Sequence, residues 1–366
     1  MKKATTGLSQ LAFTLAAFEI GSTTLFLLGA KAKQDAWLAM LIGAAGGFLL
    51  LLLYLGIVRL DSQNDLFELC RKYMGKWLGS VVALAFVFYF TYEASRNLRD
   101  IGDLATLTLL NQTPEACVTL LAVLVMADSI HLGPRAWFLT VSVLFYMIVL
   151  GYVILLLIIS FTGLVHLQFM LPVLENGLKP VWEAAVPEII SFPFGETVLF
   201  LVFFKWVSQP RKLNKSVMFT YWLTAIFLTG VNQLCILVLG PELASNTVYP
   251  LFEVTQLTKV EKIIERADPL FAMILFLGLG IKSAAFYIGA VIGMSRITVI
   301  KYKVWVIVVG AAIYLLTFLS PAFTEFLWIG LHVALEKIWP IFQIVLPLLL
   351  FFTLLIRKNK RIKSSH

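Results

Sequence analysis

The chain has 366 residues, of which 60% are apolar and only 14% are charged, and its mean hydropathy is +0.90. The apolar residues form runs of about 20, the length of a helix that crosses a bilayer. This composition excludes a water-soluble domain and indicates a polytopic membrane protein. The net charge of +8 does not indicate a nucleic-acid partner, because the basic residues lie in short loops between apolar runs.

The hydropathy pattern predicts a single transmembrane domain over residues 1–366 with ten spans. Lys2 and Lys3 precede the first span as in a signal peptide, but no small-residue cleavage site follows, so we expect this span to be uncleaved. In chain order, the predicted spans are residues 9–29, 36–58, 77–110, 115–130, 136–162, 184–207, 216–239, 269–292, 303–319 and 335–356.

The distribution of basic residues predicts the orientation of the chain. With a cytoplasmic N-terminus, 19 lysines and arginines fall on the cytoplasmic side and seven fall on the opposite side. Cytoplasmic loops of membrane proteins carry such an excess. We therefore expect both termini in the cytoplasm and an even number of spans.

Two predicted spans contain a polar break. The pattern Phe-x-x-Gly-x-Thr occurs at residues 18–23 in the first span and again, 174 residues later, at residues 192–197 in the sixth. The motif alone is weak, and its position in corresponding places of two halves gives it weight. Backbone at bilayer depth must be hydrogen-bonded, so a break there is typical of a helix that unwinds around a polar cavity.

Ten spans with breaks in the first and sixth predict an inverted repeat of two five-helix halves. We expect a first repeat at 1–162, an outer loop at 163–183, a second repeat at 184–356 and a basic cytoplasmic tail at 357–366. In this architecture two half-helix ends meet near the midplane. Their free amides can hold a carboxylate and their free carbonyls an ammonium group, so such a site suits an amino acid.

The third predicted span carries four charged side chains and a tyrosine on one face. At 100° per residue, Tyr89, Glu93, Arg96, Asp100 and Asp103 fall within about 80° of one another. They form either a self-neutralising ladder of ion pairs or, for Glu93 and Arg96, part of an outer vestibule or ligand cavity.

Three further ionisable residues lie inside predicted spans. Glu19 and Glu196 lie in or beside the breaks. Either one or both serve as a gate, a proton site or a cation partner, or they cap free amides of the half-helices. Lys282 lies mid-span in the eighth helix beside Ser283 and one turn before Tyr287. A buried ammonium there can replace a bound cation, which argues against sodium dependence; the alternative is a snorkelling or carboxylate-paired lysine.

Two outer loops, residues 163–188 and 240–268, are longer than a hairpin needs. The mixed charges and apolar residues of 259–268 predict a short amphipathic helix on the outer surface. A solvated connector and a docking surface both remain open as its role.

Four segments carry a resemblance to a known family. They are Ile20-Gly21-Ser22-Thr23-Thr24, Ala30-Lys31-Ala32-Lys33-Gln34-Asp35-Ala36-Trp37, Pro193-Phe194-Gly195-Glu196 and Glu265-Arg266-Ala267-Asp268. In these segments, and in length and span order, the chain resembles the endospore germination permeases. These are the B subunits of spore nutrient-germinant receptors, in the amino acid–polyamine–organocation superfamily. The chain departs from the family at residues 24–29, where relatives often carry an apolar, proline-containing segment.

The resemblance implies an all-α, LeuT-like fold with an amino-acid pocket between helices one, three, six and eight. It also implies a membrane-embedded A subunit and a lipoprotein C subunit as partners, in the spore inner membrane. The residues expected to bind the ligand are Gly21, Ser22, Thr23, Phe194, Gly195, Ser283 and Tyr287. The residues expected to form a gating or polar network are Glu19, Glu93, Arg96, Glu196 and Lys282.

Three functions are compatible with these observations. The first is a sensor, a transporter-shaped receptor subunit whose small, amino-acid-like ligand shifts a conformational equilibrium felt by its partners. The alternative is an amino-acid permease, uncoupled or coupled to protons through Glu19 or Glu196, and a structural subunit with an empty cavity is a third reading. We expect no enzyme, cofactor or metal site, because the sequence shows no catalytic or nucleotide motif and its three cysteines lie far apart.

Overall fold

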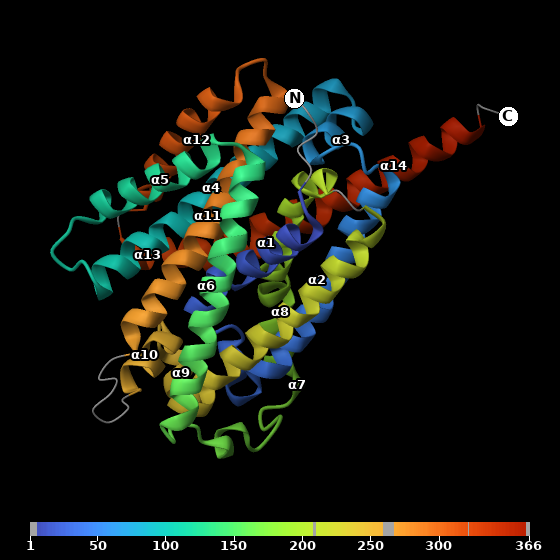
Figure 1. Ribbon diagram of the computed structural model, residues 1–366. Coiled ribbons are helices and arrows are strands. Elements are labelled where there is room, and N and C mark those ends of the chain that lie inside the picture. Colours follow the sequence, from blue (N-terminus) through green and yellow to red (C-terminus); the bar gives the residue numbers. More distant parts are fainter. Residues whose placement is uncertain (1–5, 208–209, 259–266, 321, 364–366) are drawn as a thin grey trace.

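The computed structural model describes residues 6–207, 210–258, 267–320 and 322–363 as a bundle of helices (Figure 1). The predicted amphipathic helix at 259–268 lies mostly outside these residues. In chain order the elements are α1 (Leu8–Gly21), η1 (Thr23–Leu25), η2 (Ala30–Asp35), α2 (Ala36–Leu60), α3 (Leu66–Tyr73), α4 (Lys76–Thr108), α5 (Glu115–His131), α6 (Pro134–Phe161), η3 (Leu167–Met170), α7 (Leu178–Ala184), η4 (Ala185–Ile189), η5 (Phe194–Val202), η6 (Phe204–Trp206), α8 (Pro210–Leu239), α9 (Pro241–Asn246), α10 (Pro250–Leu257), α11 (Asp268–Ile297), α12 (Tyr302–Thr317), α13 (Phe323–Trp328), η7 (Ile329–Ile338), η8 (Ile341–Val345) and α14 (Leu346–Lys363).

Within the described residues, seven helices are long and apolar enough to cross a bilayer. The other three predicted spans are also helical but shorter, and correspond to α1, α5 and α12. The count of ten spans and the inverted repeat therefore stay predictions. The seven long helices cover Ala30–Leu60, Lys76–Thr108, Pro134–Phe161, Leu178–Val202, Lys212–Leu239, Asp268–Ile297 and Thr324–Lys358.

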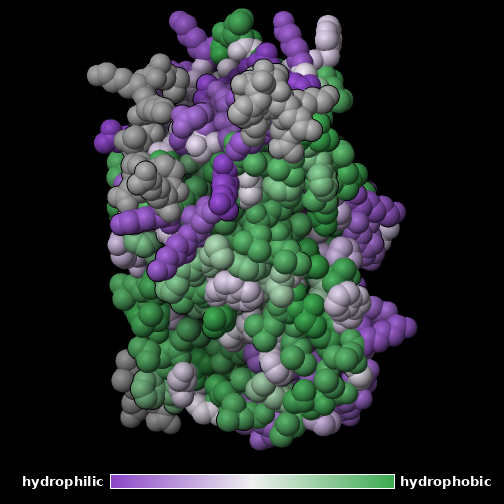
Figure 2. All heavy atoms as spheres, turned by 90° about the vertical axis from the view of Figure 1, so that its right-hand side faces the viewer, coloured by the Kyte–Doolittle hydropathy of each residue, from purple (hydrophilic) through white to green (hydrophobic). Residues whose placement is uncertain are grey.

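The surface has the polarity of a membrane protein. Figure 2 shows a broad hydrophobic band on one face, with hydrophilic residues gathered at the top, the end where Figure 1 places α3. Large apolar side chains such as Trp77, Phe88 and Ile307 are exposed on the outside of the bundle. Outward apolar side chains stay out of water only in contact with lipid, so a membrane environment explains this surface.

The centre of the bundle is the long contact between α4 and α11, with α1 and η5 packed beside them. Phenylalanines fill the space between these elements. The Phe18 ring lies 5.5 Å from Phe200 and 5.2 Å from Phe286, and Phe286 lies 5.9 Å from Phe90. The two Phe18 pairs are edge-to-face and the Phe90–Phe286 pair is tilted, and such aromatic contacts pack tightly without polar partners, which suits a water-free core.

Both predicted breaks coincide with helix ends. The α1 helix ends at Gly21, and the backbone is extended by Phe26 after one short turn. The segment after α7 is interrupted at Phe192 and Pro193, before the tight turns of η5 begin at Phe194. Each break frees backbone groups near the α4–α11 contact, which is where a polar site can form.

Several short helices lie outside the predicted spans. The outer loops 163–188 and 240–268 contain α7, α9 and α10, which Figure 1 shows at the end of the bundle away from α3. The predicted tail at 357–366 begins as a continuation of α14, which stays helical to Lys363. A further short helix, α3, joins α2 to α4 and was not predicted.

Candidate functional site

A cavity of about 220 Å³ lies beside the two breaks, at the end of the bundle that carries α9 and α10. Its wall combines both breaks, one face of α4, the α9–α10 connection and the helix before α14. The lining residues are Ser22, Phe26, Leu27, Leu28, Ala30, Glu93, Arg96, Asn97, Asp100, Glu188, Phe192, Glu196, Ser245, Thr247, Val248, Leu327, Gly330, Leu335 and Trp339.

Four residues predicted for the site line this cavity. Ser22 comes from the first break, Glu93 and Arg96 from α4, and Glu196 from η5 just after the second break. Asp100 joins them one turn beyond Arg96 on the same face of α4, as its spacing in the sequence indicates. The structure therefore brings the charged face of the third span to the two breaks.

The cavity face of α4 is not the self-neutralising ladder that its spacing allowed. Among the described residues, no carboxylate oxygen lies within 4.0 Å of the Arg96 guanidinium, which lies instead 4.8 Å from the centre of the Phe326 ring. The charge pairs of this helix use Arg99, whose Nε lies 3.1 Å from both Asp103 and Glu115. Arg96 and Glu93 are thus left facing the cavity.

A buried ion pair joins the cavity wall to α11. The Lys282 Nζ lies 2.5 Å from Glu196 Oε2, and the two side chains are 0% and 1% exposed. The ammonium also lies over two aromatic rings, 4.5 Å from the Phe192 centroid and 5.2 Å from that of Phe18. Of the alternatives for Lys282, the structure therefore shows the carboxylate-paired lysine.

Glu19 adds a second buried carboxylate to this pair. Its side chain is 1% exposed, neither carboxylate oxygen has a hydrogen-bond partner among the described residues, and it interacts electrostatically with both Lys282 and Glu196. One ammonium thus faces two carboxylates in a medium that penalises net charge. This imbalance fits either a proton shared by the carboxylates or a cation at this point.

Gly21 and Thr23 hold the first break together rather than facing the cavity. A Cβ added to Gly21 would lie 2.8 Å from the Gly278 carbonyl oxygen, so glycine permits a close crossing of α1 and α11. The Thr23 hydroxyl donates a hydrogen bond of 2.5 Å to the Glu19 carbonyl oxygen, which satisfies a backbone group that the break frees.

Four other predicted ligand contacts also lie outside the cavity lining. Phe194 packs on the Tyr221 ring at 5.3 Å, and the backbone at Gly195 lies against the Gln343 side chain. The Ser283 hydroxyl donates 2.8 Å to the Ala94 carbonyl oxygen on α4, and Tyr287 donates to the Val306 carbonyl oxygen on α12. The geometry gives these four packing and helix-joining contacts, and ligand binding by them stays a prediction.

Several lining residues were not predicted from the sequence. Asn97 shares the α4 face with Glu93, so its spacing was a signal for it. Glu188 and Thr247 lie in the predicted outer loops, Gly330 precedes the last predicted span and Trp339 lies within it. Only tertiary packing brings these segments to the breaks.

Residues 7–325 match the family described as “Spore germination protein”. The chain belongs to the spore germination protein family. This spore germination protein is 30% identical over 371 residues to Spore germination protein KB of Bacillus subtilis (strain 168), covering 100% of this chain and 98% of that relative. It is 24% identical over 279 residues to Spore germination protein B2 of the same organism, covering 74% and 73% of the two chains. The family resemblance predicted from the sequence is confirmed.

A solved transporter shares the fold of this spore germination protein. It is described as Mhp1, a nucleobase-cation-symport-1 family transporter, in a closed conformation with bromovinylhydantoin bound. The TM-score is 0.60 at 16% sequence identity, and the similarity covers 93% of this chain and 78% of that chain. At this identity the likeness concerns the fold alone, and it shows that the fold is that of a transporter.

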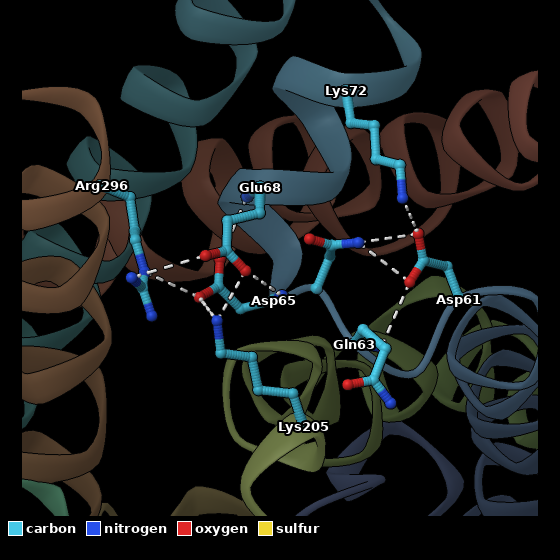
Figure 3. A network of polar contacts seen from close by, with 8 residues as sticks. Asp61, Gln63, Asp65, Glu68, Lys72, Lys205 and Arg296 are labelled. Carbon is cyan, nitrogen blue, oxygen red and sulfur yellow. Dashed lines mark hydrogen bonds and ion pairs between the residues drawn. The ribbon is translucent and has the colours of Figure 1, made fainter. Parts of the chain in front are cut away.

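The opposite end of the spore germination protein carries an ionic cluster around α3 (Figure 3). Asp65 and Glu68 form a capping box at the start of α3, in which the Asp65 carboxylate accepts from the Glu68 amide. Lys205 Nζ lies 2.7 Å from Asp65 and 2.6 Å from Glu68, and Arg296 Nε lies 3.0 Å from Asp65. The cluster joins α3, η6 and the end of α11.

The carboxyl groups of this cluster differ in their proton affinity. Burial raises the pKa of Asp65, although Lys205 lies against it. Burial acts in the same direction on Glu68, but hydrogen bonds from Lys205 and from the Asp65 amide outweigh it and lower the pKa of Glu68. Near α3, hydrogen bonds from Lys72, Asn64 and Tyr73 likewise outweigh burial and lower the pKa of Asp61.

We expect Asp65→Asn to lower the free energy of unfolding by about 2 kcal/mol, because a fully buried carboxylate loses its charge-assisted contacts with Lys205 and Arg296. Thermal unfolding of the purified protein in detergent measures this. The control is Glu183→Gln, whose ion pair with Lys179 is exposed and adds little stability. Equal unfolding temperatures for the two variants would contradict a stabilising role of the cluster.

Proposed function

We propose that this spore germination protein is the transporter-fold subunit of a spore germinant receptor. It binds a small nutrient, an amino acid, in the cavity beside the two breaks. It then signals germination to a membrane-embedded A subunit and a lipoprotein C subunit in the spore inner membrane, with both of its own termini on the core side.

The cavity supports this proposal most directly. Its volume of about 220 Å³ exceeds the share of a single water, about 30 Å³, several-fold. Its wall is mostly apolar but carries charges of both signs on Glu93 and Arg96. A pocket with an apolar wall and a few convergent polar groups is typical of small-molecule sites.

Signalling requires that the ligand bind two conformations of the protein with different affinity. The cavity wall is built from elements that meet at helix breaks, and a ligand that bridges them stabilises the arrangement in which they are close. The alternative is an amino-acid permease, which the transporter fold supports and in which the same rearrangement would move the ligand across the membrane.

The test is a bulky side chain in the wall of the cavity. Thr247→Trp in the α9–α10 connection, at a partly exposed lining residue, is expected to fill the cavity and to abolish the response of spores to the nutrient. The matched control is Asn246→Trp, because Asn246 is exposed and does not line the cavity. Gly21 is unsuitable for such a plug, since any side chain there meets the Gly278 carbonyl.

Germination with single amino acids, uptake of the same radiolabelled amino acids by growing cells, and immunoblots of the protein are measured for both variants. Loss of germination in Thr247→Trp alone, at normal protein levels, supports the receptor. Normal germination with reduced uptake supports the permease. Normal germination and uptake in both variants would exclude this cavity as the nutrient site.

A further inference from the structure

We propose that Glu93 and Arg96 together form the receptor for the two charged groups of an α-amino acid, with Glu93 binding the ammonium group and Arg96 the carboxylate. The inference rests on the proposed function, since it concerns the same cavity. In the sequence prediction, free backbone groups at the two helix breaks bind the charged groups of the ligand. Here, side chains of α4 bind them instead.

The first observation is that both side chains have unused hydrogen-bonding capacity. Glu93 is 1% exposed, and its Oε1 has no hydrogen-bond partner among the described residues. Arg96 Nη1 is likewise buried without a partner in the part of the chain that the structure describes. Buried polar atoms are almost always hydrogen-bonded, so an acid and a guanidinium left this way point to a missing partner.

The second observation is that the two residues do not pair with each other. Within the described residues no ion pair within 4.0 Å joins Glu93 to Arg96, although they are three residues apart on one helix face. The rings of Phe326 and Trp339 hold the guanidinium at 4.8 and 5.9 Å. Aromatic contacts of this kind keep Arg96 in place and leave its donors for another partner.

The third observation is the spacing of the two charges in the cavity wall. Side chains three residues apart on a helix start about 5–6 Å apart, which leaves room for the adjacent ammonium and carboxylate groups of one α-amino acid. Glu196, which also lines the cavity, is already paired with Lys282, so the unpaired acids of this wall among the described residues are Glu93 and Asp100, on either side of Arg96. We assign the ammonium group to Glu93, three residues from Arg96. A planar guanidinium suits a carboxylate, which it can bind through two parallel hydrogen bonds.

The cavity also carries more acid than base, which favours a ligand with a cationic group. Besides Arg96, its lining contains the carboxylates of Glu93, Asp100, Glu188 and Glu196, of which Glu188 pairs with Lys31 at 3.3 Å. A carboxylic acid without an amine would meet this excess unfavourably. The acid excess is therefore expected to reject the des-amino analogue of the ligand, whereas rejection of the decarboxylated analogue depends on Arg96, which would lose its carboxylate partner.

Purified protein in detergent is titrated by calorimetry with glycine, L-alanine, L-serine and L-valine, and then with propionate, ethylamine and D-glucose. The expected result is binding of at least one amino acid, with propionate and ethylamine bound at least tenfold more weakly than L-alanine. Glu93→Gln is expected to weaken amino-acid binding about tenfold or more and to remove the preference over propionate. Arg96→Gln is expected to remove the preference over ethylamine instead.

The control variant is Glu115→Gln, which removes a carboxylate that pairs with Arg99 outside the cavity lining and should leave binding unchanged. If either glutamine variant fails to fold, Glu93→Asp and Arg96→Lys are measured, with the same crossed change of preference expected. Unchanged preferences in these variants, or wild-type binding of propionate equal to that of L-alanine, would overturn the inference. Binding of D-glucose alone would overturn it together with the amino-acid ligand of the proposed function, but would leave a receptor for another small nutrient, whereas an inert Thr247→Trp plug would exclude this cavity as the nutrient site altogether.

Discussion

Replacing Lys282 by methionine is expected to lower the free energy of unfolding by about 3–5 kcal/mol and to deplete the folded protein from the membrane. Lys282 is fully buried, and its ammonium is 2.5 Å from Glu196. Without it, Glu196 and the neighbouring Glu19 remain as uncompensated carboxylates in the core. Removing one partner of a buried pair costs far more than the pair itself contributes.

The measurements are the amount of protein in membranes and its unfolding temperature in detergent. The matched control is the double variant Lys282→Met with Glu196→Gln, which removes both charges of the pair and should recover most of the lost stability. A single variant that accumulates and unfolds like the wild type would contradict the structural role of the pair. If Lys282→Met is as stable as the wild type but spores lose the nutrient response, Lys282 acts in ligand binding or signalling and not in stability.

The second large effect is expected at the crossing of α1 and α11. Gly278→Ala places a Cβ 2.9 Å from the Gly21 carbonyl oxygen and 3.0 Å from its Cα, distances at which the backbone must move. We expect a loss of about 1–3 kcal/mol, because backbone atoms cannot be displaced as cheaply as the end of a side chain. The crossing lies at the first break, so we expect the same substitution to disturb the alignment of the cavity wall as well.

The same helix supplies the control for this prediction. Gly280 lies two residues further along α11, and a Cβ there would meet nothing within 4 Å. Gly280→Ala should be neutral or stabilise the helix by about 0.5–1 kcal/mol, since alanine loses less backbone entropy than glycine. Unfolding temperatures of the two alanine variants test the contrast, and equal values would show that the close approach is not needed.

Site residues that share one helix face could be predicted from the sequence, whereas the helix that this face contacts could not. Glu93, Arg96 and Asp100 were placed together because helical spacing alone puts them on one face, and the structure brings that face to the cavity. Ser283 and Tyr287 also share a helical face, yet they bond to α4 and α12. Spacing identifies a face but not the neighbour that it meets.

By itself, the sequence determined the membrane character, the presence of the long apolar helices, the two breaks and the family. Each of these depends on residues close together in the chain: runs of apolar residues, glycine and proline within them, and short motifs. Only the tertiary structure decided that Arg96 lies against the Phe326 ring, and that Lys282 pairs with Glu196. It also brought Thr247 and Trp339 to the breaks. Such pairings depend on how helices far apart in the chain cross, and no local pattern encodes that.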